Sequence, residues 1–243
     1  MRIPSHTSYR YDSVPDLICV LGRGIERVQT NSGERWRPTR YVEAVDENGR
    51  HTGYRRHEAS MNDNRSLIAG ANANVLALCE RWGECKLLNR YPAAIIFAAG
   101  RPAYLSGAEP LLTEGQILFE TFQRRAGAKE SEAIVLAQNR NTKDDIFECA
   151  RIAAERKLCD IEVITVLVHI PRTAEFIRLA HTEMPRTRFR LTASEAILQK
   201  RYARFTKFNT AFEAVRKSRA YLRTEAQEAA GVLALRSGGY RYV

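Results

Sequence analysis

The sequence lacks any apolar run long enough to cross a membrane. Apolar runs such as Leu17–Leu21 and Ala93–Ala99 are far shorter than the roughly 20 residues that a membrane-spanning helix needs. The first ten residues are polar and contain no apolar segment before a cleavage site, so they do not resemble a signal peptide. We therefore expect no membrane span and a cytoplasmic location.

The sequence also lacks the spacings of cysteine and histidine that bind metals. Its five cysteines are an odd set without a close CxxC pair, and its five histidines show no short zinc-ligand spacing with them or with each other. The cysteines are Cys19, Cys79, Cys85, Cys149 and Cys159. Reduced, packed thiols are common in protein cores. We therefore expect free cysteines and no metal site.

Recognised nucleic-acid-binding patterns are missing as well, although the net charge is +10. Residues 195–243 hold ten Lys or Arg and four Asp or Glu, so +6 of that charge lies there. Basic and aromatic residues alternate in this segment at helical spacing, which predicts a buried aromatic stripe opposite a solvated basic face. The stripe would contain Phe205, Phe208 and Phe212, and the basic face Lys200, Arg201, Lys207 and Arg216. We do not expect nucleic acid as a partner, and an RNA-associated role of these helices is the alternative.

What the sequence contains is an alternation of short apolar runs with helix-period segments. Its 243 residues, 44% of them hydrophobic, suffice for one sizeable core, and no stretch resembles a linker between domains. The alternation predicts a single Rossmann-like α/β domain over residues 1–243, with a mainly parallel sheet flanked by helices. Strands are expected at Leu17–Leu21, Ala93–Ala99, Ala133–Leu136, Ile161–Val168 and Phe189–Leu191.

Helices are expected between these strands and in the C-terminal segment. The turn sequence Asp46-Glu47-Asn48-Gly49 adds a β-hairpin insertion at about 41–55, between Tyr41–Val45 and Arg50–Arg55. Gly83 is expected to end the first helix, and Thr142 is a natural N-cap. The helices are expected at Ala73–Trp82, Leu112–Arg125, Thr142–Lys157 and Pro171–His181, and at Glu195–Leu235 with a break near Asn209-Thr210.

Glycines and polar residues follow four of the predicted strands, each time just before a helix. The segments are Gly22–Gly24, Gly100–Arg101, Asn139–Thr142 and His169–Arg172. The carboxyl ends of parallel strands lie along one edge of a sheet, and open α/β sheets bind ligands in the crevice beside that edge. We therefore expect these four segments to become neighbours around one cleft.

The chemistry of these segments favours a small anionic ligand. Glycines let the backbone approach a ligand, helix N-termini offer free N–H groups, and arginines supply planar cationic donors. The predicted ligand-binding residues are Gly22, Arg23, Gly24, Gly100, Arg101, Arg140, Asn141, Thr142 and Arg172. Each also has an ordinary structural alternative, such as a strand-ending turn, a helix cap, or an ion pair of Arg172 with Glu175.

Five short motifs occur in order along this part of the chain. They are LGRG at Leu21–Gly24, AAGR at Ala98–Arg101, TEGQILFE at Thr113–Glu120, NRNT at Asn139–Thr142 and VHIPRTAEF at Val168–Phe176. The set resembles the YdcF/SanA/ElyC-type family over about residues 16–177. The chain departs from the family pattern where Arg23 replaces a glycine, where Ala98-Ala99 replaces the usual serine before glycine, and where Asn139 replaces a common serine.

The resemblance implies a Rossmann-like fold with a ligand pocket. The family's motif positions place Gly22, Gly24, Gly100, Glu114, Asn141, Thr142, His169 and Arg172 at that pocket. Members of the family are often membrane-anchored or exported and are linked to envelope and polyprenyl-phosphate metabolism, and one is reported to bind S-adenosylmethionine. This chain shows no anchor.

Two classes of function fit the pattern. The first is an enzyme that acts on a phosphorylated or nucleotide-like metabolite by hydrolysis or group transfer. His169 and Glu114 are its candidate catalytic residues, because histidine titrates near neutral pH and burial can raise the pKa of a carboxyl group. Arginines 101, 140 and 172 would hold the anion. The second class is an S-adenosylmethionine- or nucleotide-binding module or methyltransferase-like protein, which makes S-adenosylmethionine the one candidate cofactor.

Overall fold

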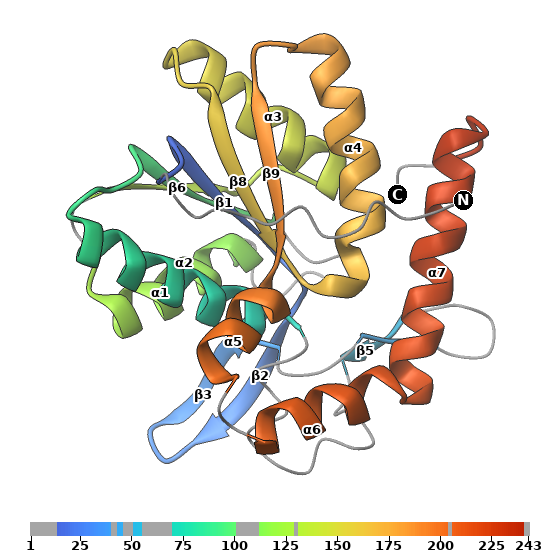
Figure 1. Cartoon of the computed structure of the whole chain (residues 1–243). Coiled ribbons are helices and arrows are strands. Elements are labelled where there is room, and N and C mark those ends of the chain that lie inside the picture. The colour runs from blue at the N-terminus through green and yellow to red at the C-terminus, as the bar shows by residue number, and fades with distance from the viewer. Residues whose placement is uncertain are drawn as a thin grey trace.

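Five parallel strands form the central sheet, in the order β7-β6-β1-β8-β9 (Figure 1). They are β1 (Leu17–Leu21), β6 (Ala94–Ala98), β7 (Glu132–Leu136), β8 (Asp160–Thr165) and β9 (Arg188–Ala193). Every residue of β1 and of β6 is buried, as expected for inner strands of a parallel sheet with helices on both faces. The predicted Rossmann-like α/β fold is confirmed. The structure is a computed structural model that describes residues 14–39, 43–45, 51–54, 70–100, 112–128, 131–203 and 206–240.

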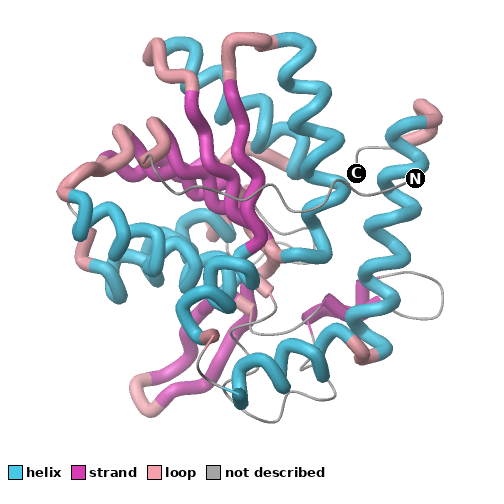
Figure 2. The backbone as a smooth tube through the Cα atoms, viewed as in Figure 1, coloured by secondary structure: helices cyan, strands magenta, loops and turns pink. Residues whose placement is uncertain are grey.

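Helices cover both faces of this sheet (Figure 2). On one face lie α1 (Ala71–Leu88), α2 (Glu114–Ala126) and α5 (Ser194–Tyr202), and on the other α3 (Thr142–Glu155) and α4 (Ile170–Glu183). The remaining helices are α6 (Thr206–Arg216) and α7 (Arg219–Arg236), and α7 packs along α4 (Figure 1). Among the described residues, no helix combines the length and the apolar content that a membrane crossing requires.

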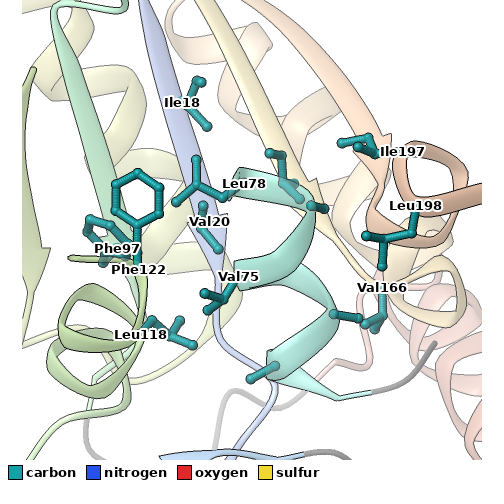
Figure 3. Packing of buried hydrophobic residues seen from close by; sticks show 14 of the residues in the cluster. Ile18, Val20, Val75, Leu78, Phe97, Leu118, Phe122, Val166, Ile197 and Leu198 are labelled. Atoms are coloured by element: carbon teal, nitrogen blue, oxygen red, sulfur yellow. The ribbon is translucent and has the colours of Figure 1, made fainter. Parts of the chain in front are cut away.

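The two faces of the sheet carry separate hydrophobic cores, because successive side chains of a strand point to opposite faces. Ile18 and Val20 of β1 pack with residues of α1, α2 and α5, including Leu78 (Figure 3). Leu17 and Cys19 point the other way and pack with residues of α3 and α4. The uninterrupted apolar sequence of β1 therefore serves both cores at once.

The order of the strands places a crevice beside β1. The strands β6 and β7 lie on one side of β1, whereas β8 and β9, which come later in the chain, lie on its other side. In open α/β sheets, this reversal of direction leaves a ligand crevice at the carboxyl ends of the two strands that flank the switch. In this sheet those strands are β1 and β8.

Two antiparallel hairpins lie outside the main sheet. The strands β4 (Glu43–Val45) and β5 (His51–Tyr54) pair as the turn sequence between them predicts. The strands β2 (Ile25–Thr30) and β3 (Gly33–Pro38) pair directly after β1, where the sequence analysis predicts no strand. Gly33 closes their turn with a φ of 110°, a conformation that glycine adopts without steric cost.

The predicted end of the first helix is wrong. Helix α1 continues through Gly83 and ends at Leu88, followed by the C-cap Asn89, whose φ of 48° is left-handed. Trp82 and Cys85, on either side of Gly83, are both buried. Their burial outweighs the roughly 1 kcal/mol that a glycine costs inside a helix.

Two further boundaries differ from the prediction. The strand β8 ends at Thr165. Of the further residues that were expected in the strand, Leu167 and Val168 belong to a short 3₁₀ turn, Leu167–His169, that leads into α4. The C-terminal segment is interrupted after Tyr202 and again at Ser218, rather than near Asn209-Thr210. Ser218 marks the start of α7, because its hydroxyl accepts the N–H of Tyr221 and so caps this helix.

Candidate functional site

A polar cavity of about 470 Å³ opens at the carboxyl ends of β1 and β8. Its lining comes from five parts of the chain that are distant in sequence. It consists of Gly22, Arg23, Gly24, Glu114, Thr142, His169, Arg172, Gln227, Glu228 and Ala230. Seven of these ten residues were predicted from the sequence, and the other three belong to α7.

The turn after β1 is held in place by Glu114. Gly22 has no room for a side chain, because a Cβ atom there would lie 2.3 Å from the Cβ of Ala99 and 2.7 Å from Oε2 of Glu114. The backbone N–H groups of Arg23 and Gly24 both donate to Oε1 of Glu114. These N–H groups are therefore bonded to the protein's own carboxylate. Glu114 positions the turn, and its role as a proton-transfer residue stays a prediction.

Arg23 and Arg172 reach the same carboxylate from different strand ends. Nη1 of Arg23 lies 3.2 Å from Oε1 of Glu228. Arg172 places its Nε 2.8 Å from Oε2 and its Nη2 3.1 Å from Oε1 of Glu228, so its guanidinium faces the carboxylate with two nitrogens. Glu228 is only 4% exposed. The cavity therefore already contains an anionic group, Glu228, that two cations share.

Arg172 does form an ion pair with an acidic residue, as the structural alternative predicts, but its partner is not Glu175. Glu175 pairs with Arg178 on its own helix and with Arg236 of α7. Arg172 instead turns toward α7, where it bonds Glu228 and also donates from Nη1 to the Tyr240 hydroxyl at 3.4 Å. The sequence gives no sign of this pairing because the partners are 56 positions apart.

His169 is a buried, neutral imidazole beside these charges. It is 2% exposed, and burial, reinforced by the positive charges of Arg172 and Arg23, lowers its pKa well below the ordinary value of 6.5. Nη2 of Arg172 lies 3.4 Å from Nε2 of His169. A guanidinium can only donate, so Nε2 accepts and Nδ1 carries the proton. Nδ1 then donates to the Thr165 hydroxyl at 3.1 Å.

The N-terminus of α3 contributes Thr142 to the cavity. The prediction that Thr142 caps this helix is wrong, because the cap is Asn141, whose side chain accepts the N–H of Asp144 at 3.1 Å. Thr142 is the first helical residue, and its hydroxyl lies 3.5 Å from Nε2 of His169. Residues at the N-termini of three helices, α2, α3 and α4, therefore line one cavity, an arrangement that favours anions.

Three of the remaining predicted residues do not line the cavity. Gly100 lies against the next loop, where a Cβ atom would come within 1.7 Å of the carbonyl oxygen of Asn139, so its role is close packing. Asn141 acts as the helix cap. Arg140 is exposed at the surface. Arg101 lies outside the described residues.

A further buried acidic side chain, Glu195, holds the segment that leads to His169. Oε2 of Glu195 accepts the N–H of Leu167 at 2.7 Å and the Ser194 hydroxyl at 3.1 Å. Burial raises the pKa of Glu195 to about 7, although these bonds and the charge of Arg23 act against the rise. Glu195 therefore fixes the 3₁₀ turn that ends with His169.

The basic C-terminal segment agrees with its predicted layout where its side chains are described. Phe212 is buried and packs in the core. Lys200 and Arg201 are exposed and pair with Glu84 and Glu80 of α1. Arg216 is also exposed. Phe205 and the side chains of Phe208 and Lys207 lie outside the described part of the structure.

Sequence reasoning missed the contribution of α7. Nothing in the local sequence separates Glu228 from Glu225, which lies on the same helix and is exposed. One available signal is Gly231, because a small residue inside a helix permits close packing. A Cβ atom there would lie 3.3 Å from Cδ of Arg172.

Within the described ranges, no group of three or more His, Cys, Asp or Glu side chains is arranged to hold a metal ion. No protein-family model matches the chain, and no curated protein or solved structure matches it significantly. The geometry of the cavity is therefore the basis on which a function can be assigned.

Proposed function

We propose that this protein binds a small anionic metabolite, phosphorylated or nucleotide-like, in the cavity at the carboxyl ends of β1 and β8, and acts on it by hydrolysis or group transfer. One observation carries the proposal: Arg23 and Arg172, from different strand ends, converge on a single carboxylate inside the cavity. Two guanidinium groups arranged in this way match the oxygens of a phosphoryl group. The predicted resemblance to the YdcF/SanA/ElyC-type family is compatible with the same ligand class.

The position and size of the cavity support this ligand class. Its volume of about 470 Å³ lies within the range of roughly 300–1,000 Å³ that is usual for small-molecule sites. It lies at the switch point of the sheet, where folds of this order bind nucleotides and related ligands. S-adenosylmethionine, the candidate cofactor, belongs to the same size class and is part of the test.

The chemistry that these side chains can perform is proton transfer beside a bound anion. Arg23 and Arg172 would hold the anion and stabilise charge that develops during reaction. Nε2 of His169 is the unprotonated nitrogen of a neutral imidazole, so it can accept a proton from an attacking water or hydroxyl group. Thr142, whose hydroxyl is 3.5 Å from this nitrogen, would orient that group or the ligand.

A binding screen with a matched pair of variants tests the proposal. Thermal unfolding is measured with nucleotides, nucleotide sugars, prenyl phosphates, S-adenosylmethionine and inorganic phosphate, and affinities of the compounds that bind are measured by calorimetry. Arg172→Ala should weaken binding at least tenfold, because it removes one of the two guanidinium groups that face the cavity. Arg178→Ala is the control, since Arg178 lies on the same helix, is 62% exposed in its side chain and pairs with Glu175.

Catalysis is tested separately from binding. Once a ligand is identified, His169→Asn should lower turnover far more than affinity, because Asn keeps polarity but cannot accept a proton at neutral pH. Binding without turnover in wild-type protein would favour the binding-module alternative. If none of the compounds binds, or if folded Arg172→Ala protein binds as wild type does, the proposed site is wrong.

A further inference from the structure

The last helix of the chain places a carboxylate where the proposed function requires the ligand's anion. Glu228 belongs to α7, which lies outside the sheet and packs along α4. Its two carboxylate oxygens contact the same guanidinium groups, of Arg23 and Arg172, that would bind a phosphoryl group. A ligand anion cannot contact both arginines in this way while Glu228 does.

The approach of α7 to the cavity is close. Gln227, Glu228 and Ala230 all line it, and Gly231 faces Arg172 at a distance that leaves little space for a side chain. Farther along, Arg236 pairs with Glu175 of α4, and Tyr240 stacks edge-on against Phe176. These contacts anchor α7 independently of Glu228, so the Glu228 side chain can leave the arginines while the helix stays docked.

The balance of charge shows what such an exchange requires. Arg23 and Arg172 face Glu228, Glu114 is bonded to the backbone of the turn, and His169 is neutral. A monoanionic ligand that replaced Glu228 would substitute one carboxylate for another. It would also compete with a tethered group, whose effective concentration is typically millimolar or higher. A phosphoryl dianion brings a second negative charge and a third oxygen.

From this balance we infer that Glu228 is a built-in competitor that sets a charge threshold for the site, admitting phosphoryl dianions such as phosphate monoesters or pyrophosphate and excluding monoanionic carboxylates. The inference rests on the proposed function and specifies its ligand class. Glu228 acts as a specificity-determining residue, because any ligand must bind the two arginines more strongly than the internal carboxylate does. In the absence of such a ligand, Glu228 keeps both arginines paired.

Calorimetric titration of wild-type protein and three variants with inorganic phosphate, pyrophosphate and acetate tests the inference. Glu228→Gln should bind phosphate about tenfold more tightly, which corresponds to about 1.4 kcal/mol of lost competition, and should bind acetate measurably where wild-type protein does not. Glu225→Gln removes the same charge from an exposed position of the same helix and should bind as wild type does.

Glu228→Asp separates displacement from a general effect of charge. This variant keeps the negative charge, but its carboxylate is withdrawn by one methylene and competes less well for the two arginines. We expect it to bind phosphate more tightly than wild type does. If Glu228→Gln gains affinity and Glu228→Asp does not, the charge of Glu228 repels the ligand without occupying its place, and the inference is overturned.

Two further readouts keep the test decisive. Loss of Glu228 leaves two cations without this partner and lowers stability, so phosphate should raise the melting temperature of Glu228→Gln more than that of wild type. Weaker phosphate binding by Glu228→Gln than by wild type would overturn the inference while leaving the proposed function intact. Failure of all four proteins to bind phosphate or pyrophosphate would refute the proposed function as well.

Discussion

Glu195 allows a quantitative test of the electrostatics behind the site. Its carboxyl group is 2% exposed and accepts bonds from the Leu167 N–H and the Ser194 hydroxyl. Burial raises its pKa from 4.5 to about 7. Glu195→Gln keeps the shape and one acceptor oxygen, but it removes the titration. Comparison with this variant therefore measures how much free energy of unfolding is lost when Glu195 ionises in the folded protein.

The sign and size of the effect follow from the two pKa values. The unfolded chain releases the Glu195 proton once the pH exceeds about 4.5, whereas the folded chain keeps it until about pH 7. Stability that is present below pH 4.5 is therefore lost as the pH rises through this window, and the loss is complete above about pH 7. At 1.36 kcal/mol per pKa unit, the total is about 3 kcal/mol.

Urea unfolding of wild-type and Glu195→Gln proteins at about pH 4.5, 6 and 8 measures this loss as a difference between free energies of unfolding. All other titrating groups are common to both proteins, so their contributions cancel. From pH 4.5 to pH 8, the free energy of unfolding of Glu195→Gln minus that of wild type should increase by about 3 kcal/mol. Glu225→Gln, at an exposed position of α7, should show no such shift. A difference for Glu195→Gln that stays constant from pH 4.5 to 8 would refute the reasoning.

Three further predictions concern the same edge of the sheet and its support. Burial, with two nearby arginines, lowers the pKa of His169. The free energy of unfolding of wild-type protein should therefore fall by up to about 1.4 kcal/mol per pH unit below about pH 6.5. His169→Asn should be less sensitive to acid in the same titrations, and an acid sensitivity equal to that of wild type would contradict this prediction. Gly100→Ala should sharply lower the melting temperature, because the added Cβ atom would meet the Asn139 carbonyl oxygen. Gly83→Ala, whose Cβ atom would have nothing within 4 Å, should raise the free energy of unfolding by about 1 kcal/mol. Equal effects of the two substitutions would show that Gly100 does not make this close contact. Asn141→Ala should lose about 1 kcal/mol of unfolding free energy through loss of the helix cap and Asn141→Asp little, and equal losses would argue against the cap.

The sheet and most of the cavity lining could be predicted because both depend on short-range patterns. Leu17–Leu21 is an uninterrupted apolar run, which fits a strand that is buried on both faces. Gly22, Thr142 and His169 each follow a strand, and the geometry of a parallel sheet brings such positions together. The hairpin of β2 and β3 was missed because Ile25–Thr30 contains only two apolar residues, Ile25 and Val28, which lie three positions apart. The regular alternation of burial along this strand therefore does not appear as an alternation of apolar and polar residues.

The rest of the site depends on packing between distant segments, which no local pattern encodes. Glu228 and Glu225 are equivalent in sequence terms, and only the docking of α7 on α4 makes one buried and the other exposed. The role of Glu114 was hidden for a related reason. It lies at the start of α2, where a carboxylate is common, and its bonds to the turn after β1 join residues 90 positions apart.

The two carboxylates of the cavity, Glu114 and Glu228, have different roles, and that of Glu228 depends on the docking of α7. Glu114 bonds the backbone of the turn after β1. Arg23 and Arg172, half-buried beside a neutral His169, would without a counter-anion leave two cations in a poorly solvated cavity, which is costly. Glu228 supplies that anion from a helix outside the sheet. Under the proposed function, α7 would hold the arginines in place when the ligand is absent, and the strength of their pairing with Glu228 would set how strongly a ligand must bind to replace it.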